Sequence, residues 1–130
     1  MLRRILIVDD EEYVVLTLQE GLKKLPNCEV VVATSGKQAL GLFEQQPFDL
    51  LITDYKMPGM DGMMLAARVR QLYPRTAIIV ITAYPGETLC EQARRVSVQR
   101  ILDKPVGLVE LRSVALEALD GLENGQAVAD

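Results

Sequence analysis

Residues 50–54 read Leu50-Leu51-Ile52-Thr53-Asp54, and residues 55–62 continue as Tyr55-Lys56-Met57-Pro58-Gly59-Met60-Asp61-Gly62. A short apolar run is typical of a buried strand, and the proline and glycines after it are typical of a loop. The stretch therefore predicts a strand with one carboxylate, that of Asp54, at its C-terminal end. A charged group presented by an apolar strand in this manner indicates a site.

Other apolar segments end in the same way. We expect further strands at residues 4–8, 29–33, 77–82 and 100–103. The polar residues that three of them present at their C-terminal ends are Asp9 and Asp10, Thr82, and Lys104. Two more carboxylates, a hydroxyl and an amine therefore accompany Asp54.

Helical patterns separate the five strands. The first helix carries an apolar stripe and is expected to end at Pro26-Asn27, and the third begins after Gly62. The residues that fit their helical periods are Val15, Leu18, Leu22 and Leu25 in the first, and Met64, Leu65, Ala67, Arg68 and Leu72 in the third. Alternating strands and helices with continuously apolar strands predict an α/β fold, a parallel sheet covered by helices on both faces.

Right-handed crossovers leave few ways to wind such a sheet, and the flavodoxin-like (βα)5 fold with strand order 2-1-3-4-5 is the simplest. In that order the first and third strands are neighbours. Sites in such sheets form outside the C-terminal strand ends. The carboxylates of Asp9, Asp10 and Asp54 are therefore expected at one place.

The composition fits one globular domain, which we expect at residues 1–122, followed by a flexible tail or the start of a linker at 123–130. The 14 Lys and Arg against 18 Asp and Glu give a net charge of -4, which argues against direct nucleic-acid binding. The sequence has no histidine, and Cys28 and Cys90 have no metal-type spacing. No apolar run is long enough for a membrane span or a signal-peptide core, so we expect a cytoplasmic protein.

Three carboxylates at one edge repel one another unless a positive charge lies among them. Lys104 is one candidate, and a hard divalent cation is the other. All-oxygen ligands suit Mg²⁺, which keeps waters and accepts phosphate oxygens. A carboxylate can attack phosphorus, and phosphoryl transfer needs mainly alignment and charge neutralisation. Asp54 with Mg²⁺, Lys104 and Thr82 would form such a phosphoacceptor site.

The ordered set of motifs resembles the receiver domain of bacterial two-component response regulators. The residues that carry the resemblance, over about positions 3 to 122, are Asp9-Asp10, Asp54, Met57 to Gly62, Thr82-Ala83 and Lys104-Pro105. It implies that Asp54 is phosphorylated, that Thr82 senses the phosphoryl group, and that Lys104 contacts it. The Mg²⁺ ligands that it implies are Asp9 (mostly through water), Asp10, Asp54 and the backbone carbonyl of Lys56.

The resemblance also implies a partner and an activity. The phosphoryl donor would be a phosphohistidine on a sensor histidine kinase or a histidine phosphotransfer protein. The chain would catalyse only its own phosphorylation and dephosphorylation, within two-component or phosphorelay signalling. We also expect the long side chains of Lys56 and Tyr84, which border the site, to cover the phosphoryl group and slow its loss.

Departures from the family pattern bear on the output and on one turn. Ile101 stands three residues before the lysine, where many receivers carry Tyr or Phe, so output through an inward-turning ring is in question. Val96-Ser97-Val98 replaces the usual Gly-Ala before the fifth strand, so we expect the preceding turn to differ.

Two other functions are weighed against the phosphorylated switch. A phosphorylation-independent pseudo-receiver would use the same fold for dimerisation or docking; the complete site speaks against it and Ile101 for it. A metal-dependent phosphatase of similar topology would need an acid two residues after its nucleophile, where this sequence has Lys56.

A homodimer through the fourth helix, fifth strand and fifth helix is a further open alternative. The charged residues expected on that face are Glu91, Arg94, Arg95, Arg100, Glu110, Glu117 and Asp120. They either pair between copies or face solvent, which is the common state of charged side chains.

Overall fold

Five strands alternate with five helices in a computed structural model, which describes residues 2–123. The strands are β1 (Arg3–Val8), β2 (Cys28–Ala33), β3 (Leu50–Asp54), β4 (Ala77–Thr82) and β5 (Arg100–Asp103). The helices are α1 (Glu12–Leu22), α2 (Gly36–Gln45), α3 (Gly62–Leu72), α4 (Glu87–Val96) and α5 (Leu108–Glu123). The predicted α/β class is confirmed. The expected tail at 123–130 lies outside the described residues, except for Glu123, the last residue of α5.

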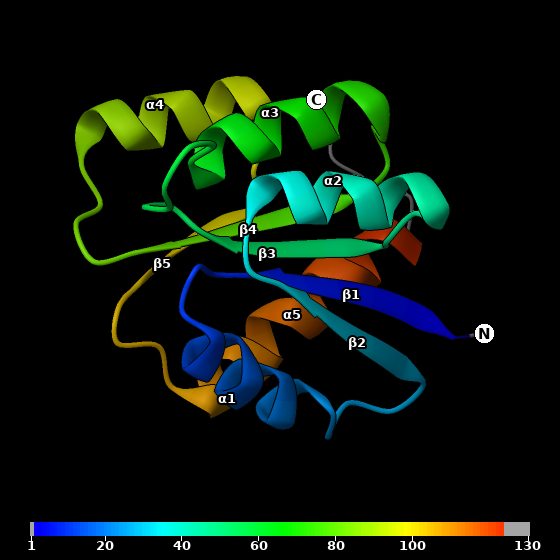
Figure 1. The fold of residues 1–130 in the computed structure, drawn as a ribbon. Helices are drawn as coiled ribbons and strands as arrows, with labels where there is room; N and C mark the ends of the chain where they lie inside the picture. The colour runs from blue at the N-terminus through cyan, green and yellow to red at the C-terminus, as the bar shows by residue number, and fades with distance from the viewer. Residues whose placement is uncertain (1, 124–130) are drawn as a thin grey trace.

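The strands form one parallel sheet in the order β2-β1-β3-β4-β5, as predicted for the flavodoxin-like fold. Figure 1 shows α1 and α5 on one face of this sheet and α2, α3 and α4 on the other. β1 and β3 are neighbours, with Val8 paired to Thr53 near their ends. Because the strands run in one direction, their C-terminal ends meet at one edge.

The central strands are buried on both faces, which accounts for their continuously apolar sequence. Along β1, Ile5 and Ile7 pack with α1 and α5, whereas Leu6 and Val8 pack with the helices of the opposite face. Successive side chains of a strand point to opposite faces, so one strand serves two cores. Every residue of β3 and β4 is buried. The strand ends are therefore where these strands present polar groups.

The first helix ends earlier than the sequence predicts. α1 ends at Leu22, and the expected end at Pro26-Asn27 is wrong. Leu25 is buried even so, in the following turn, where its N–H donates to the Leu22 carbonyl at 3.0 Å. The apolar spacing of the helix therefore continues to Leu25, beyond the helix end, because a turn can also direct a side chain into the core.

The third helix buries a different face from the one that the sequence suggested. Its buried residues are Gly62, Met63, Leu65, Ala66 and Val69, whereas Met64 and Leu72 are 53% and 52% exposed. The Asp61 carboxylate accepts the Met64 N–H at 2.8 Å and caps the helix. α3 carries apolar side chains on most of its faces, so periodicity alone did not identify the face that is buried.

The turn before β5 is held by a side chain from α3. The Arg70 guanidinium donates to the Val96 and Ser97 carbonyls, both at 2.9 Å, and to those of Pro74 and Thr76 at 3.0 and 2.6 Å. Ser97 adopts a left-handed conformation with φ of 60° as the C-cap of α4. Glycine adopts that conformation freely, so Ser97 takes at a cost the conformation that a glycine at this turn would take without one.

Candidate functional site

The three carboxylates predicted to meet do meet. Asp54 ends β3, and Asp9 and Asp10 follow β1, its neighbour in the sheet. One carboxylate oxygen from each lies within 4.8 Å of those from the other two. Asp9 and Asp54 are buried and Asp10 is exposed. Three negative charges are therefore concentrated at the edge of the molecule where solvent can reach them from one side.

Lys104 supplies the positive charge predicted for this cluster. Its Nζ atom lies 2.8 Å from Oδ1 of Asp54, and its backbone N–H donates to the Thr82 carbonyl at 2.9 Å. The Lys104-Pro105 peptide bond is cis. Burial lowers the pKa of Lys104, but the hydrogen bond and the charge of Asp54 outweigh burial, so the pKa is raised.

Asp9 is the carboxylate that the protein alone leaves least well compensated. Burial raises its pKa to about 6 and the nearby charge of Asp54 adds to this, although the Glu11 N–H donates to Asp9 Oδ1 at 2.9 Å and opposes the rise. Lys104 contacts Asp54 rather than Asp9. A cation between the carboxylates would relieve the remaining repulsion.

Thr82 lies at the end of β4 and is buried. Its hydroxyl oxygen accepts the Tyr84 N–H at 3.2 Å. Thr82 lines a cavity of about 300 Å³ that also brings together the residues Asp10, Glu11, Asp54, Tyr55, Lys56, Ala83, Tyr84 and Lys104. One cavity is thus lined by most of the predicted site residues, namely Asp10, Asp54, Lys56, Thr82 and Lys104. Asp9 lies beside this cavity.

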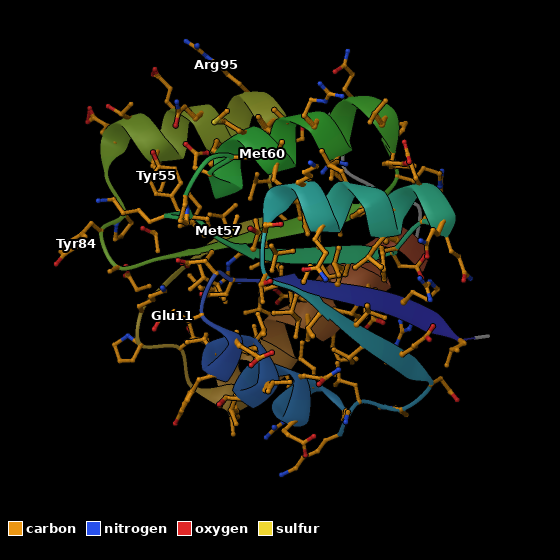
Figure 2. The ribbon with its side chains drawn as sticks, in the orientation of Figure 1. Glu11, Tyr55, Met57, Met60, Tyr84 and Arg95 are labelled. Carbon is orange, nitrogen blue, oxygen red and sulfur yellow. The ribbon has the colours of Figure 1, made fainter. Side chains whose placement is uncertain are left out.

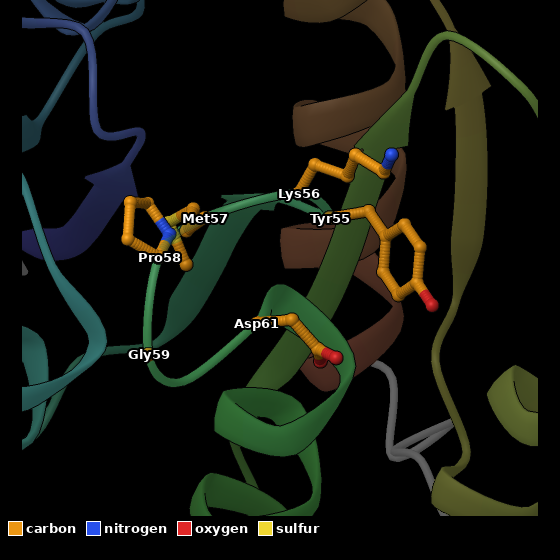
Figure 3. A pocket seen from close by; sticks show the side chains of 6 residues that line it. All are labelled: Tyr55, Lys56, Met57, Pro58, Gly59 and Asp61. Carbon is orange, nitrogen blue, oxygen red and sulfur yellow. The ribbon is translucent and has the colours of Figure 1, made fainter.

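The loop after β3 forms a second hollow beside this cavity, of about 440 Å³. Figure 3 shows Lys56 and Tyr55 on one side of it, Met57 and Pro58 on the other, and Asp61 at the start of α3. Lys56 lines both spaces. The loop therefore places Lys56 at the rim of the acidic cluster.

Of the two residues expected to cover the phosphoryl group, Tyr84 is directed away from the site, whereas Lys56 lines its rim. Tyr84 is 85% exposed, and Figure 2 shows its side chain pointing away from the domain. Lys56 is exposed too. In this conformation Tyr84 gives the site little cover, because its side chain is directed into solvent.

The site residues fit a hard divalent cation. The clustered ligand atoms are all carboxylate oxygens, with no thiolate or imidazole among them. Oxygen ligands are those that Mg²⁺ prefers, and one exposed carboxylate leaves room for the waters that Mg²⁺ keeps. Sequence reasoning did not identify Glu11 as a site residue. Its backbone N–H orients the Asp9 carboxylate, and its place in the loop after β1 is the only feature of the sequence that could have indicated this role.

The chain belongs to the response regulator receiver domain family, whose model matches residues 5–116. It is 39% identical over 107 residues to a response regulator receiver protein from Anaeromyxobacter sp. (strain Fw109-5), covering 82% of this chain and 44% of that one. It is 31% identical over 120 residues to a protein named probable chemotaxis protein CheY from Rhizobium etli, covering 91% and 92%. The chain thus spans less than half of the first relative and most of the second.

Solved structures agree with this assignment. A receiver domain protein from Methanospirillum hungatei matches with a TM-score of 0.90 and 28% identity, covering 96% of this chain and 99% of that one. The receiver domain of an HD domain-containing protein from Pseudomonas fluorescens matches with 0.88 and 34%, covering 95% and 99%. Among residues 2–123, no helix has the length and apolar character needed to span a membrane.

Proposed function

We propose that this domain accepts a phosphoryl group on Asp54 from a phosphohistidine of a sensor histidine kinase or histidine phosphotransfer protein, in the cytoplasm. The observation that carries the proposal is the contact of Lys104 with Asp54 inside a cluster of three carboxylates. A buried nucleophile, a cation beside it and acidic neighbours are the parts that phosphoryl transfer to a carboxylate needs.

Each residue around Asp54 would have a different role in phosphoryl transfer. Asp54, which lines the cavity, would present a carboxylate oxygen to phosphorus. Lys104 can follow the negative charge from that carboxylate to a phosphoryl oxygen, and the Thr82 hydroxyl can donate to another. Asp9, Asp10, Asp54 and the Lys56 carbonyl would hold Mg²⁺, which when bound neutralises charge on the phosphoryl oxygens. No general base is required, because a carboxylate carries no proton that must be removed before it attacks phosphorus.

A surface suited to the donor lies beside the site. A groove of about 430 Å³ runs between α1 and the loop after β5, lined by Val14, Leu18, Pro105 and Val106 and reaching Asp9 and Lys104. The same helix also exposes the side chains of Tyr13 and Leu16 to solvent. An apolar surface next to a phosphoacceptor fits a protein donor rather than a small molecule. One relative is named sporulation initiation phosphotransferase F, from Bacillus subtilis.

Dimerisation through α4, β5 and α5 is a weaker part of the proposal. Two ion pairs form on that face within one chain, Arg100 with Glu117 at 3.3 Å and Arg95 with Glu91 at 3.9 Å. A homodimer would have to exchange such pairs for ones between copies. Sedimentation before and after phosphorylation tests this: a shift to twice the mass only in the phosphorylated protein supports a dimer.

The first experiment is the intact mass after incubation with Mg²⁺ and acetyl phosphate. The parent should gain one phosphoryl group, Asp54→Ala should gain none, and Asp103→Asn, which changes an exposed acid at another strand end, should behave as the parent. If the parent gains nothing from acetyl phosphate or from a phosphorylated histidine donor and binds no Mg²⁺, the pseudo-receiver function replaces this proposal.

A further inference from the structure

Gly62, the first residue of α3, lies directly against the strand end that carries Asp54. A Cβ at position 62 would lie 2.0 Å from the carbonyl oxygen of Asp54, and 2.9 Å from both the Asp54 carbonyl carbon and the Tyr55 Cα. Non-bonded heavy atoms have their best separation near 3.5 Å, so a side chain here would displace the strand end by about 1 Å or more. Glycine is therefore required by space.

The backbone conformation does not impose glycine at this position. Gly59 is the glycine with a left-handed φ in the loop, at 76°, whereas Gly62 begins a regular helix. The atoms that the added carbon would meet belong to the backbone, so no side-chain rotation relieves the contact. Sequence reasoning took Gly62 only as loop punctuation, because a close approach between α3 and β3 cannot be seen in the sequence.

The peptide that Gly62 approaches is fixed from three directions. The Tyr55 N–H donates to the Ile81 carbonyl at 2.8 Å, and the Gly62 N–H donates to the Tyr55 carbonyl at 2.7 Å. The Thr53 hydroxyl donates to the Asp54 carbonyl at 2.9 Å. A displacement at Gly62 would therefore pass to Asp54 and Tyr55 rather than be absorbed locally.

We propose that Gly62 is a positioning residue for the phosphoacceptor, because it lets α3 begin against the Asp54 carbonyl and so sets where two Mg²⁺ ligands lie. The Asp54 carboxylate belongs to the residue in contact with Gly62, and the Lys56 carbonyl follows two residues later. The inference rests on the proposed function and adds to it the residue that sets the ligand geometry.

Gly62→Ala tests the proposal, with Gly41→Ala as the matched control, since a Cβ at Gly41 meets nothing within 4 Å. A misplacement of about 1 Å at a reacting group costs about 100-fold in rate, so phosphoryl uptake from acetyl phosphate should fall by that factor in Gly62→Ala. The affinity for Mg²⁺, measured by titration calorimetry, should fall in the same variant. Both should be unchanged in Gly41→Ala. A folded Gly62→Ala variant that matches the parent in both would overturn the proposal.

A loss of stability without misplacement is distinguished by a second variant. Met63→Ala removes a buried side chain from the next residue of α3 and adds no atom against the Asp54 carbonyl. It should lower the melting temperature and keep the Mg²⁺ affinity of the parent. If Met63→Ala weakens Mg²⁺ binding as much as Gly62→Ala does, Gly62 has only a structural role.

Two further measurements do not depend on phosphorylation, and the second does not depend on a folded Gly62→Ala. In the metal-free protein, hydrogen exchange of the Tyr55 amide should be faster in Gly62→Ala than in Gly41→Ala. If Gly62→Ala does not fold, Thr53→Val can be used instead, because it removes the hydrogen bond to the same Asp54 carbonyl. It should weaken Mg²⁺ binding about fivefold, which corresponds to the free energy of one hydrogen bond. Unchanged Mg²⁺ binding in Thr53→Val would overturn the proposal. Failure of the parent to accept phosphate would instead refute the proposed function, while Mg²⁺ affinity and hydrogen exchange still test Gly62.

Discussion

Lys104 and Asp54 form an ion pair of 2.8 Å across the C-terminal edge of the sheet, between the loop after β5 and the last residue of β3. β4 lies between these two strands, so the lysine reaches over Thr82 to make the contact. The pair neutralises one of three clustered carboxylates and leaves Asp9 and Asp10 without a comparable partner at Lys104. Under the proposed function, the affinity for a cation and the reactivity of Asp54 would therefore depend on the same amine.

Replacing Lys104 should therefore separate the two properties. In Lys104→Met, phosphoryl uptake by Asp54 should fall about 100-fold, the usual cost of removing one group that stabilises developing charge. The affinity for Mg²⁺ should rise, because a competing positive charge is gone. Titration calorimetry and the time course of intact mass measure the two effects. Lys37→Met, which changes an exposed lysine of α2, should alter neither; weaker Mg²⁺ binding in Lys104→Met would contradict the interpretation.

Asp9 should make the metal-free protein less stable as pH rises. Its pKa is raised to about 6 from the ordinary 3.8, so the folded state holds this proton more tightly than the unfolded state. Its contribution to the free energy of unfolding is fully present below pH 3.8 and is lost as pH rises through 6. Asp9→Asn should therefore be more stable than the parent by about 3 kcal/mol at pH 7.5 and equal to it near pH 3.5.

Urea unfolding in EDTA at the two pH values measures this difference. Added Mg²⁺ should stabilise the parent more than Asp9→Asn, since the variant lacks one of the proposed ligands. An equal stability difference at both pH values would show that the charge of Asp9 is not its cause.

Arg70 should be a large stability determinant that no other basic residue of α3 matches. Its guanidinium donates to four carbonyls, two of them in the turn before β5, and burial lowers its pKa. A lysine cannot reproduce this planar set of donors, so Arg70→Lys should cost about 2–4 kcal/mol of unfolding free energy. Arg68→Lys, at an exposed position of the same helix, should cost almost nothing. Equal urea midpoints for the two variants would disprove the role.

Ser97 should be a site where one substitution stabilises the domain. Its φ of 60° is a conformation that residues with a Cβ adopt at a cost and glycine adopts freely. Ser97→Gly should raise the free energy of unfolding by about 0.5–1 kcal/mol, whereas Ser97→Ala should not raise it. Thermal melts of both variants beside the parent decide the matter, and a gain in Ser97→Ala alone would point to another cause.

Particular elements show how far sequence reasoning reached. The strands were located well because a fully buried parallel strand is an uninterrupted apolar run, as in Leu50 to Ile52 and Ala77 to Ile81. The helix faces were less certain: Met64 and Leu72 fitted the period of α3 and are exposed. Helix period gives a stripe, but which stripe is buried depends on where the helix begins and what covers it.

The residues of the candidate site were also only partly predictable from the sequence. The polar residues at the strand ends were identified because parallel strands and a fixed order bring their C-terminal ends together. Gly62 and Arg70 were missed as contact residues because their partners are backbone atoms of other elements, which leave no mark in the local sequence.

The sequence by itself determined the strand order and the set of groups at one edge, since apolar runs, turn residues and right-handed crossovers admit few arrangements. Only the tertiary structure decided which carboxylate Lys104 contacts, how deeply Asp9 is buried, and how closely α3 approaches Asp54. Those are distances of a few ångströms between separate elements. They depend on how the helices pack on the sheet. The residue types constrain that packing only when all the elements are assembled.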